Sequence, residues 1–220
     1  MPYVTRTLEE LLNRTDPAWP LVQDWLRSAT RRVETLPAAD TSGDALVSLQ
    51  VTTRSPLGAV VYHSGGILVD DGWLRVLGFG HARLPRSLPS WNFACGMVES
   101  NTPPPALLVA DDVVGGFFAL NAGRFAPGGH NVWYFAPDTL QWEDLGMSYS
   151  QFLGWAFSGD LTAFYASLRW PGWEREVRQL SGDHALSIYP FLCAAGPPIE
   201  QRSRRSVPIE ELFRLHVGAL

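Results

Sequence analysis

The stretch LLVADDVVGGFFALNAG, from Leu107 to Gly123, decides the fold class of this chain. Two apolar runs, 107–110 and 117–120, flank a pair of aspartates and a pair of glycines. Runs rich in valine, phenylalanine and leucine favour strands, and glycine supplies the positive φ of a tight turn. Aspartate also suits turns, because its side chain bonds to nearby backbone. The stretch therefore predicts two antiparallel strands joined by a hairpin turn.

Asp111 and Asp112 have a second reading, as a general acid–base pair or half of a metal site. Neighbouring strand residues point to opposite faces of a sheet, so these two carboxylates do not easily converge on one substrate. We interpret them as turn residues, with the acidic site as the alternative. Asp70-Asp71-Gly72 lies between two further apolar runs and receives the same interpretation, because Asp-Gly is a strong hairpin signal.

Further strand patterns follow the central stretch. Asn131–Ala136 predicts a strand, and the segment LQWEDLG returns after a turn at Pro137-Asp138. A capping box at Ser148 and Gln151 then begins a helix that Gly159 ends.

Helix patterns precede the strands. Thr7 and Glu10 form a capping box for a helix at 8–14, and Asp16 with Pro17 predicts the start of a second helix. Residues 45–53 fit both a helix and a strand, and we favour the helix. Another helix is expected to begin at Ser55-Pro56 and to stop at Gly65-Gly66. The segments RRVETLPAADTSGD and LPRSLPSWN are expected to be loops.

The C-terminal part is predicted to be mainly helical. Asp160 caps one helix, and WEREVRQL forms another. ALSIYPFLCA is expected to be a buried extended segment or edge strand, and PPIEQRSRRS a loop. Ser206 is expected to cap a final helix at 208–217. Antiparallel strands flanked by helices indicate a single α+β domain over 1–220, with a core at 45–160 and a helical extension at 161–220.

Composition excludes several functional classes. The 220 residues are 46% hydrophobic and 18% charged, as in soluble globular proteins. All seventeen basic residues are arginine, which removes Schiff-base and P-loop lysine chemistry. A net charge of -5 disfavours nucleic-acid binding and suits a basic protein partner. Without a signal peptide or a long apolar run, the chain is expected to be cytoplasmic, with no membrane contact.

The sequence contains no recognisable catalytic or metal-binding pattern. The glycines around Gly78 and Gly80 lack the third glycine of a dinucleotide fingerprint. The five histidines show no metal-ligand spacing, so we predict no metal, no cofactor and no catalytic residue. A catalytic triad from distant residues stays open. Cys95 and Cys193 lie in apolar surroundings and are expected to be buried free thiols, with a disulfide as the alternative.

Six candidate binding residues lie in a predicted loop, a predicted turn and a predicted strand. Arg86, Trp91 and Asn92 share the proline-rich segment, and exposed tryptophan and arginine are frequent binding hot spots. For Trp91 we favour the alternative, a side chain that fills the core. Asp111, Asp112 and Trp142 complete the candidate set.

Residues 55–159 resemble the core of the SUKH superfamily. The resemblance rests on Gly65-Gly66, Asp111-Asp112, Gly115-Gly116, the strand 117–120 and the Ser-Gln-Phe-Leu segment at 150–153. The whole chain also resembles a bacterial family of unknown function allied to that superfamily. The C-terminal extension and the Trp91 segment depart from the pattern. The resemblance implies a protein-binding module, as in bacterial immunity proteins that block toxins and in fungal regulators of cell-wall synthesis.

These observations give two functional expectations. The first is a non-enzymatic protein-binding module, a monomer or homodimer, of which a toxin-immunity protein with a basic toxin as partner is one form. The alternative is a small-molecule-binding protein or hydrolase-like enzyme with an aromatic-lined pocket.

Overall fold

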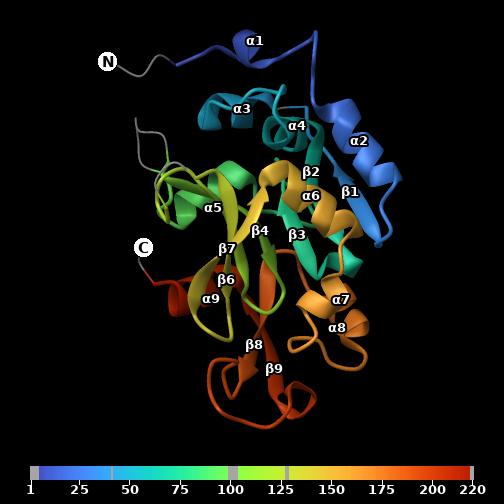
Figure 1. Cartoon of the computed structure of the whole chain (residues 1–220), viewed down its shortest axis with the longest axis vertical. Helices are drawn as coiled ribbons and strands as arrows, with labels where there is room; N and C mark the ends of the chain where they lie inside the picture. The colour runs from blue at the N-terminus through green and yellow to red at the C-terminus, as the bar shows by residue number, and fades with distance from the viewer. Residues whose placement is uncertain (1–4, 41, 99–103, 127–128, 219–220) are drawn as a thin grey trace.

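A seven-stranded antiparallel sheet forms the centre of the computed structural model, which describes residues 5–40, 42–98, 104–126 and 129–218 (Figure 1). Its strands lie side by side in the order of the sequence. They are β1 Val33–Pro37, β2 Ser64–Val69, β3 Leu74–Leu77, β4 Ala106–Asp112, β5 Phe117–Asn121, β6 Asn131–Ala136 and β7 Gln141–Ser148. The predicted α+β class is confirmed.

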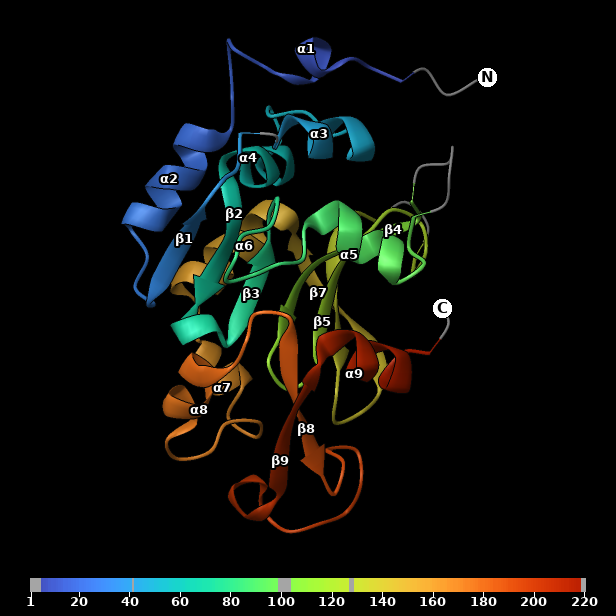
Figure 2. The same cartoon turned by 180° about the vertical axis from the view of Figure 1, so that it is seen from behind.

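A second sheet and the helices surround this centre. β8 His184–Tyr189 and β9 Ser203–Pro208 form a two-stranded antiparallel sheet that projects from the body (Figures 1 and 2). The helices are α1 Leu8–Leu11, α2 Trp19–Arg27, α3 Gly43–Leu49, α4 Pro56–His63, α5 Leu88–Ala94, α6 Tyr149–Ser158, α7 Leu161–Phe164, α8 Trp173–Gln179 and α9 Ile209–His216, with 3-10 turns η1 Asp70–Gly72 and η2 Ile199–Gln201. Over the described ranges, no helix is both long enough and apolar enough to cross a bilayer.

Helices cover both faces of the large sheet. On one face, α6 places Phe152 with its ring 5.1 Å from that of Phe118 on β5. On the other face, α5 and α9 cover Phe117, whose ring lies 5.0 Å from that of Phe213. α6 crosses the sheet in Figure 1, and α5 and α9 lie in front of it in Figure 2. The alternation of Phe117 and Phe118 along one strand therefore supplies apolar side chains to two separate layers.

Both predicted hairpins are confirmed. β4 and β5 pair antiparallel, and Gly115 adopts φ +89° in the turn between them. β2 and β3 pair across η1, where Asp70 and Asp71 have φ values of 49° and 61°. Aspartate tolerates this left-handed region better than most residues, which explains its place in the turn.

The prediction that Gly65-Gly66 ends a helix is wrong. The helix α4 begins after Ser55 as predicted, but it ends at His63 and β2 starts at Ser64. A Cβ atom on Gly65 would lie 2.6 Å from the carbonyl oxygen of Pro37 and 2.8 Å from that of Gly80. This glycine therefore allows close approach of neighbouring backbone inside a strand, rather than a helix cap.

Two segments predicted as loops are regular elements. LPRSLPSWN contains the start of α5, where Ser87 and Ser90 form a capping box and Pro89 lies in the first turn. Proline is tolerated there because the first N–H groups of a helix have no intrahelical partner. RRVETLPAADTSGD contains β1, which pairs with β2 from Val33 to Pro37.

The predicted start of the second helix is also wrong. α2 begins at Trp19 with Ala18 as its N-cap and Pro20 in its first turn. The Asp16 carboxylate lies 3.6 Å from the Arg54 guanidinium instead. The two-residue displacement keeps proline near the helix start but removes the aspartate from the cap.

The C-terminal segment is less helical than predicted. RSRRS lies mostly in β9, and Ser206 is paired with Leu186 of β8 rather than capping α9. ALSIYPFLCA contains β8, as expected for an extended segment. Strand pairing satisfies the backbone hydrogen bonds of the polar segment RSRRS. The segment has no apolar periodicity from which a strand could be predicted.

The two thiols differ from each other. Both are free, but Cys193 is exposed, so the prediction that it is buried is wrong. Cys95 is partly buried, and this burial raises the pKa of its thiol to about 12.

Candidate functional site

One row of side chains crosses a single face of the large sheet. Strand register aligns its members in the order Glu34, Leu68, Arg75, Asp111, Phe117, Phe135 and Trp142. The aromatic end lies under α5 and α9. The other end is polar and lies beside the turn between α8 and β8.

Asp111 is a buried carboxylate shared by two arginines. Its Oδ1 accepts from Arg75 Nε at 2.7 Å, and its Oδ2 accepts from a terminal nitrogen of Arg86 at 2.6 Å. The side chain of Asp111 is 0% exposed, that of Arg75 2% and that of Arg86 11%. Since two cations face one anion, this buried triad carries one uncompensated positive charge.

Backbone carbonyls accept several of the remaining donors of this triad, although the buried Arg86 Nε has no hydrogen-bond partner among the described residues. Arg75 donates to the carbonyl oxygens of His184 at 2.6 Å and Asp112 at 3.3 Å. Arg86 donates to the Gly182 carbonyl at 2.9 Å. Burial lowers the pKa of Arg75, and the Asp111 charge opposes that shift. The two guanidiniums thereby fasten the turn before β8 to the large sheet.

Asp112 faces the other side of the sheet and organises the hairpin turn. Its Oδ1 accepts from the backbone N–H groups of Val114 at 3.1 Å and Gly116 at 2.8 Å. Its Oδ2 accepts from the Tyr134 hydroxyl at 2.9 Å. Burial raises the pKa of Asp112, while these hydrogen bonds oppose the shift. The opposite orientations of the two aspartates confirm the argument from strand geometry.

Trp91 and Asn92 are buried on α5. The Trp91 ring lies 4.7 Å below the Arg86 guanidinium and packs edge-on against Phe213, which confirms the core interpretation. The Asn92 amide accepts from the Leu108 N–H at 2.7 Å and donates to the Leu108 carbonyl at 2.9 Å. Asn92 thus pairs with β4 as a strand neighbour would.

The six candidate residues do not line one surface. Arg86, Trp91 and Asp111 come together in the interior. Trp142 is half-buried against Phe125 at the far end of the row. A binding role for the six stays a prediction, whereas each of them has a packing or hydrogen-bonding role within the fold.

Two further aspartates, interpreted from the sequence as turn residues with an acidic site as the alternative, repeat the pattern of Asp111. Asp71 contacts Arg32 at 2.8 Å and Arg178 at 2.9 Å. Asp70 contacts Arg31, and also Arg169 at 2.7 Å.

A signal for these pairs was present in the sequence. Arg31-Arg32 directly precedes β1 and Asp70-Asp71 directly follows β2, so antiparallel pairing of the two strands brings the doublets together.

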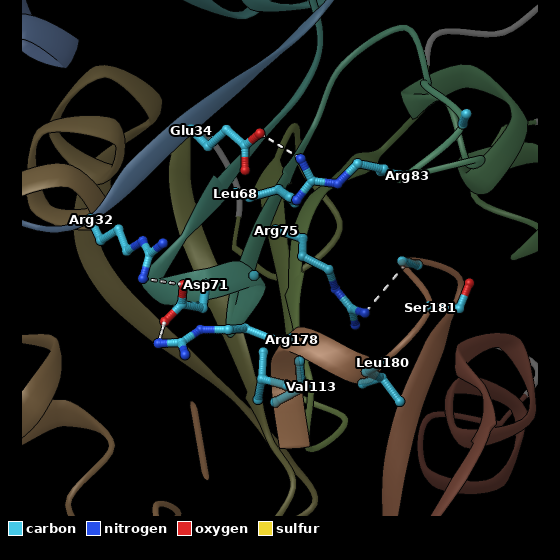
Figure 3. A pocket seen from close by; sticks show the side chains of 14 residues that line it. Arg32, Glu34, Leu68, Asp71, Arg75, Arg83, Val113, Arg178, Leu180 and Ser181 are labelled. Atoms are coloured by element: carbon cyan, nitrogen blue, oxygen red, sulfur yellow. Dashed lines mark hydrogen bonds and ion pairs between the residues drawn. The ribbon is translucent and has the colours of Figure 1, made fainter. Parts of the chain in front are cut away.

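A cavity of about 500 Å³ opens at the polar end of the row (Figure 3). Four arginines line it: Arg32, Arg75, Arg83 and Arg178. In Figure 3, Arg75 lies in the middle of the view, and Arg32, Arg83 and Arg178 lie around it together with the Asp71 and Glu34 carboxylates. In the described ranges, no group of three or more histidine, cysteine, aspartate or glutamate side chains is arranged to hold a metal ion.

Comparison with known proteins adds relatives but no activity. The family model described as protein of unknown function DUF2625 matches residues 8–212. A putative uncharacterized protein YbfG of Escherichia coli K12 is 46% identical over 211 residues, covering 96% of this chain and 95% of that protein. An uncharacterized protein of Haemophilus influenzae is 39% identical over 211 residues, covering 95% of this chain and 92% of that protein.

Proposed function

The chain belongs to the DUF2625 family, and from this premise we propose that it is a non-enzymatic protein-binding module that binds its partner through the β8–β9 hairpin. The single observation that carries the proposal is an exposed apolar loop at the end of this projecting hairpin. The resemblance to the SUKH superfamily agrees with a binding role, although neither the family match nor the relatives point to that superfamily.

The loop between β8 and β9 is apolar and accessible. From Tyr189 to Ile199 it reads YPFLCAAGPPI, with no charged side chain. Tyr189 is 67% exposed and Phe191 39%, and their rings lie 6.1 Å apart. Exposed apolar patches on a soluble fold mark contact sites, and tyrosine is enriched among binding hot spots.

Arg202 holds this loop in a fixed shape. Its guanidinium donates to the carbonyl oxygens of Pro190 at 3.0 Å, Phe191 at 2.7 Å, Ala194 at 3.2 Å and Pro197 at 2.9 Å. A loop ordered in advance loses less conformational entropy on binding. The four hydrogen bonds from Arg202 therefore support binding of this loop to a partner surface of complementary shape.

A hollow at the base of the loop could accept part of the partner. The cavity has a volume of about 440 Å³ and lies between Asp138 and Leu168 of the body and Leu192 and Pro198 of the loop. A protein side chain can fill such a hollow, and side chains seated in pockets form the energetic centres of interfaces.

The local charge favours a partner with acidic groups around an apolar contact. The hairpin contains Arg202, Arg204 and Arg205 but only one acidic residue, Glu200. Arg204 pairs with Glu176 at 3.0 Å, and Arg205 lies 3.7 Å from Glu211, but the Arg205 side chain is 77% exposed and keeps donors for a partner. The expectation of a basic toxin rests on the net charge of the whole chain, and an immunity role stays a prediction. The hairpin itself argues for an acidic surface on the partner.

Site-specific crosslinking in cells that express the chain from its own chromosome tests the proposal. A photoreactive phenylalanine replaces Phe191 in one variant and Phe93 in the control, because Phe93 is 75% exposed on α5 away from the hairpin. We expect one discrete protein to be crosslinked from position 191 and not from position 93. The purified partner is then titrated against the wild type, Phe191→Asp and Phe93→Asp.

The proposal requires a loss of affinity of about tenfold or more for Phe191→Asp and little change for Phe93→Asp. Equal crosslinking from both positions, or unchanged affinity for Phe191→Asp, would overturn it. Binding of the wild type to phosphatidylglycerol vesicles that Phe191→Asp abolishes, without any protein crosslink, would also overturn it in favour of a membrane surface.

A further inference from the structure

We propose that the cavity at the polar end of the sheet row binds a small organic anion that carries two or more carboxylate or phosphate groups. This inference rests on different residues from those of the proposed protein-binding surface. Its basis is the arrangement of guanidinium groups around the hollow in Figure 3.

Three arginines at the sides of the cavity keep donors available. Arg32 and Arg178 each contact Asp71 through one terminal nitrogen, and Arg83 contacts Glu34 in the same way. Their side chains are 69%, 54% and 55% exposed. A guanidinium has five N–H donors in a planar fork, so each can bind a further oxyanion in bidentate geometry.

Positive charge exceeds negative charge around the cavity. Two carboxylates, Asp71 and Glu34, line it together with four guanidiniums. The fourth, Arg75, faces Asp111, but Arg86 already shares that carboxylate. The excess stands out in a chain whose net charge is -5, and it focuses a positive potential on the hollow.

Apolar side chains complete the cavity and set the class of ligand. Leu68, Val113 and Leu180 contribute to its lining. A volume of about 500 Å³ falls within the usual range for small-molecule sites. Separated guanidiniums with apolar surface between them fit an organic ligand with anionic groups at more than one position, rather than a single inorganic ion.

Calorimetric titration of the full chain with pyrophosphate and with citrate, at constant ionic strength, tests the proposal. We expect saturable binding of at least one probe at a single site. Preference for pyrophosphate would identify a phosphate ester as the ligand class, and preference for citrate a polycarboxylate. Chloride at equal ionic strength measures non-specific screening.

Arg178→Gln and Arg83→Gln should each weaken the preferred probe about tenfold, because each removes a charged bidentate donor. Arg27→Gln is the matched control, since Arg27 is 69% exposed, pairs with one aspartate and lies outside the cavity lining. Thermal unfolding of all variants establishes that they are folded. Absence of saturable binding for both probes, or an equal loss in Arg27→Gln, would overturn the proposal.

Discussion

Replacement of the two central aspartates by asparagine should separate their roles. Asp111→Asn keeps the shape of the side chain but leaves Arg75 and Arg86 without a counter-charge at 2% and 11% exposure. Loss of one partner from a buried ion pair costs about 3–5 kcal/mol. Two guanidiniums depend on this carboxylate, so we expect a loss at the upper end, about 4–5 kcal/mol. Against a typical unfolding free energy of about 5–15 kcal/mol, this is a large fraction.

Asp112→Asn should cost much less, about 1 kcal/mol or below. The asparagine oxygen can still accept from the Val114 and Gly116 N–H groups, and its amide can donate to the Tyr134 oxygen. Burial raises the pKa of Asp112 above its ordinary value of 3.8. The contribution of this group to stability is therefore full below that value, where the carboxyl is protonated, and is lost as pH rises through the raised pKa. Relative to the wild type, Asp112→Asn should therefore gain stability as pH rises from about 4 through that raised pKa.

Urea unfolding followed by circular dichroism measures both changes, with Asp24→Asn as the control. Asp24 pairs with Arg27 at the surface, where its side chain is 63% exposed, and its replacement should change stability by about 0–1 kcal/mol. A loss below about 1 kcal/mol for Asp111→Asn would refute the account of the buried triad. Equal losses for Asp111→Asn and Asp112→Asn would refute the separation of roles.

Other substitutions and reagents test the packing. Gly116→Ala should destabilise the protein by about 2–3 kcal/mol, because a Cβ atom would collide with Asp112 and Tyr134. Gly154→Ala should stabilise it by up to about 1 kcal/mol, because a Cβ atom at this position of α6 would meet open space. Thermal unfolding of the two variants measures both changes. Burial lowers the pKa of His216 below 6.5, so the contribution of this histidine to stability is present at neutral pH and falls as pH drops toward 5. In His216→Gln, the free energy of unfolding should therefore depend less on pH over that range than it does in the wild type. With Ellman's reagent at pH 8, the exposed Cys193 should react quickly and Cys95 only on unfolding, because burial raises its pKa to about 12.

Local signals made most of the central sheet predictable. The Asp-Gly and Gly-Gly turns and the capping boxes at Thr7 and Ser148 act within a few residues, and the structure confirms them. The failures occurred where a residue's role depends on distant chain. Gly65 looks like a helix stop until Pro37 and Gly80 are placed against it.

The candidate site was harder to predict for the same reason. Asp111 was identified, and so was Arg86, but their contact needs the register of β3 and β4 and the position of the loop before α5. No local sequence pattern predicts the burial of Arg75, because an arginine within the strand segment LRVL is expected to face solvent. Only the assembled sheet shows that it is 2% exposed.

The sequential order of the strands has a consequence for synthesis on the ribosome. Each strand from β2 to β7 pairs with the one made just before it, so the large sheet can grow strand by strand as the chain emerges. The Gly182 and His184 carbonyls are made after all seven of these strands, yet Arg75 and Arg86 donate hydrogen bonds to them. A nascent chain therefore has to expose residues 182–184 before Arg75 and Arg86 can make all their hydrogen bonds, and α9 has to follow before Phe117 is covered.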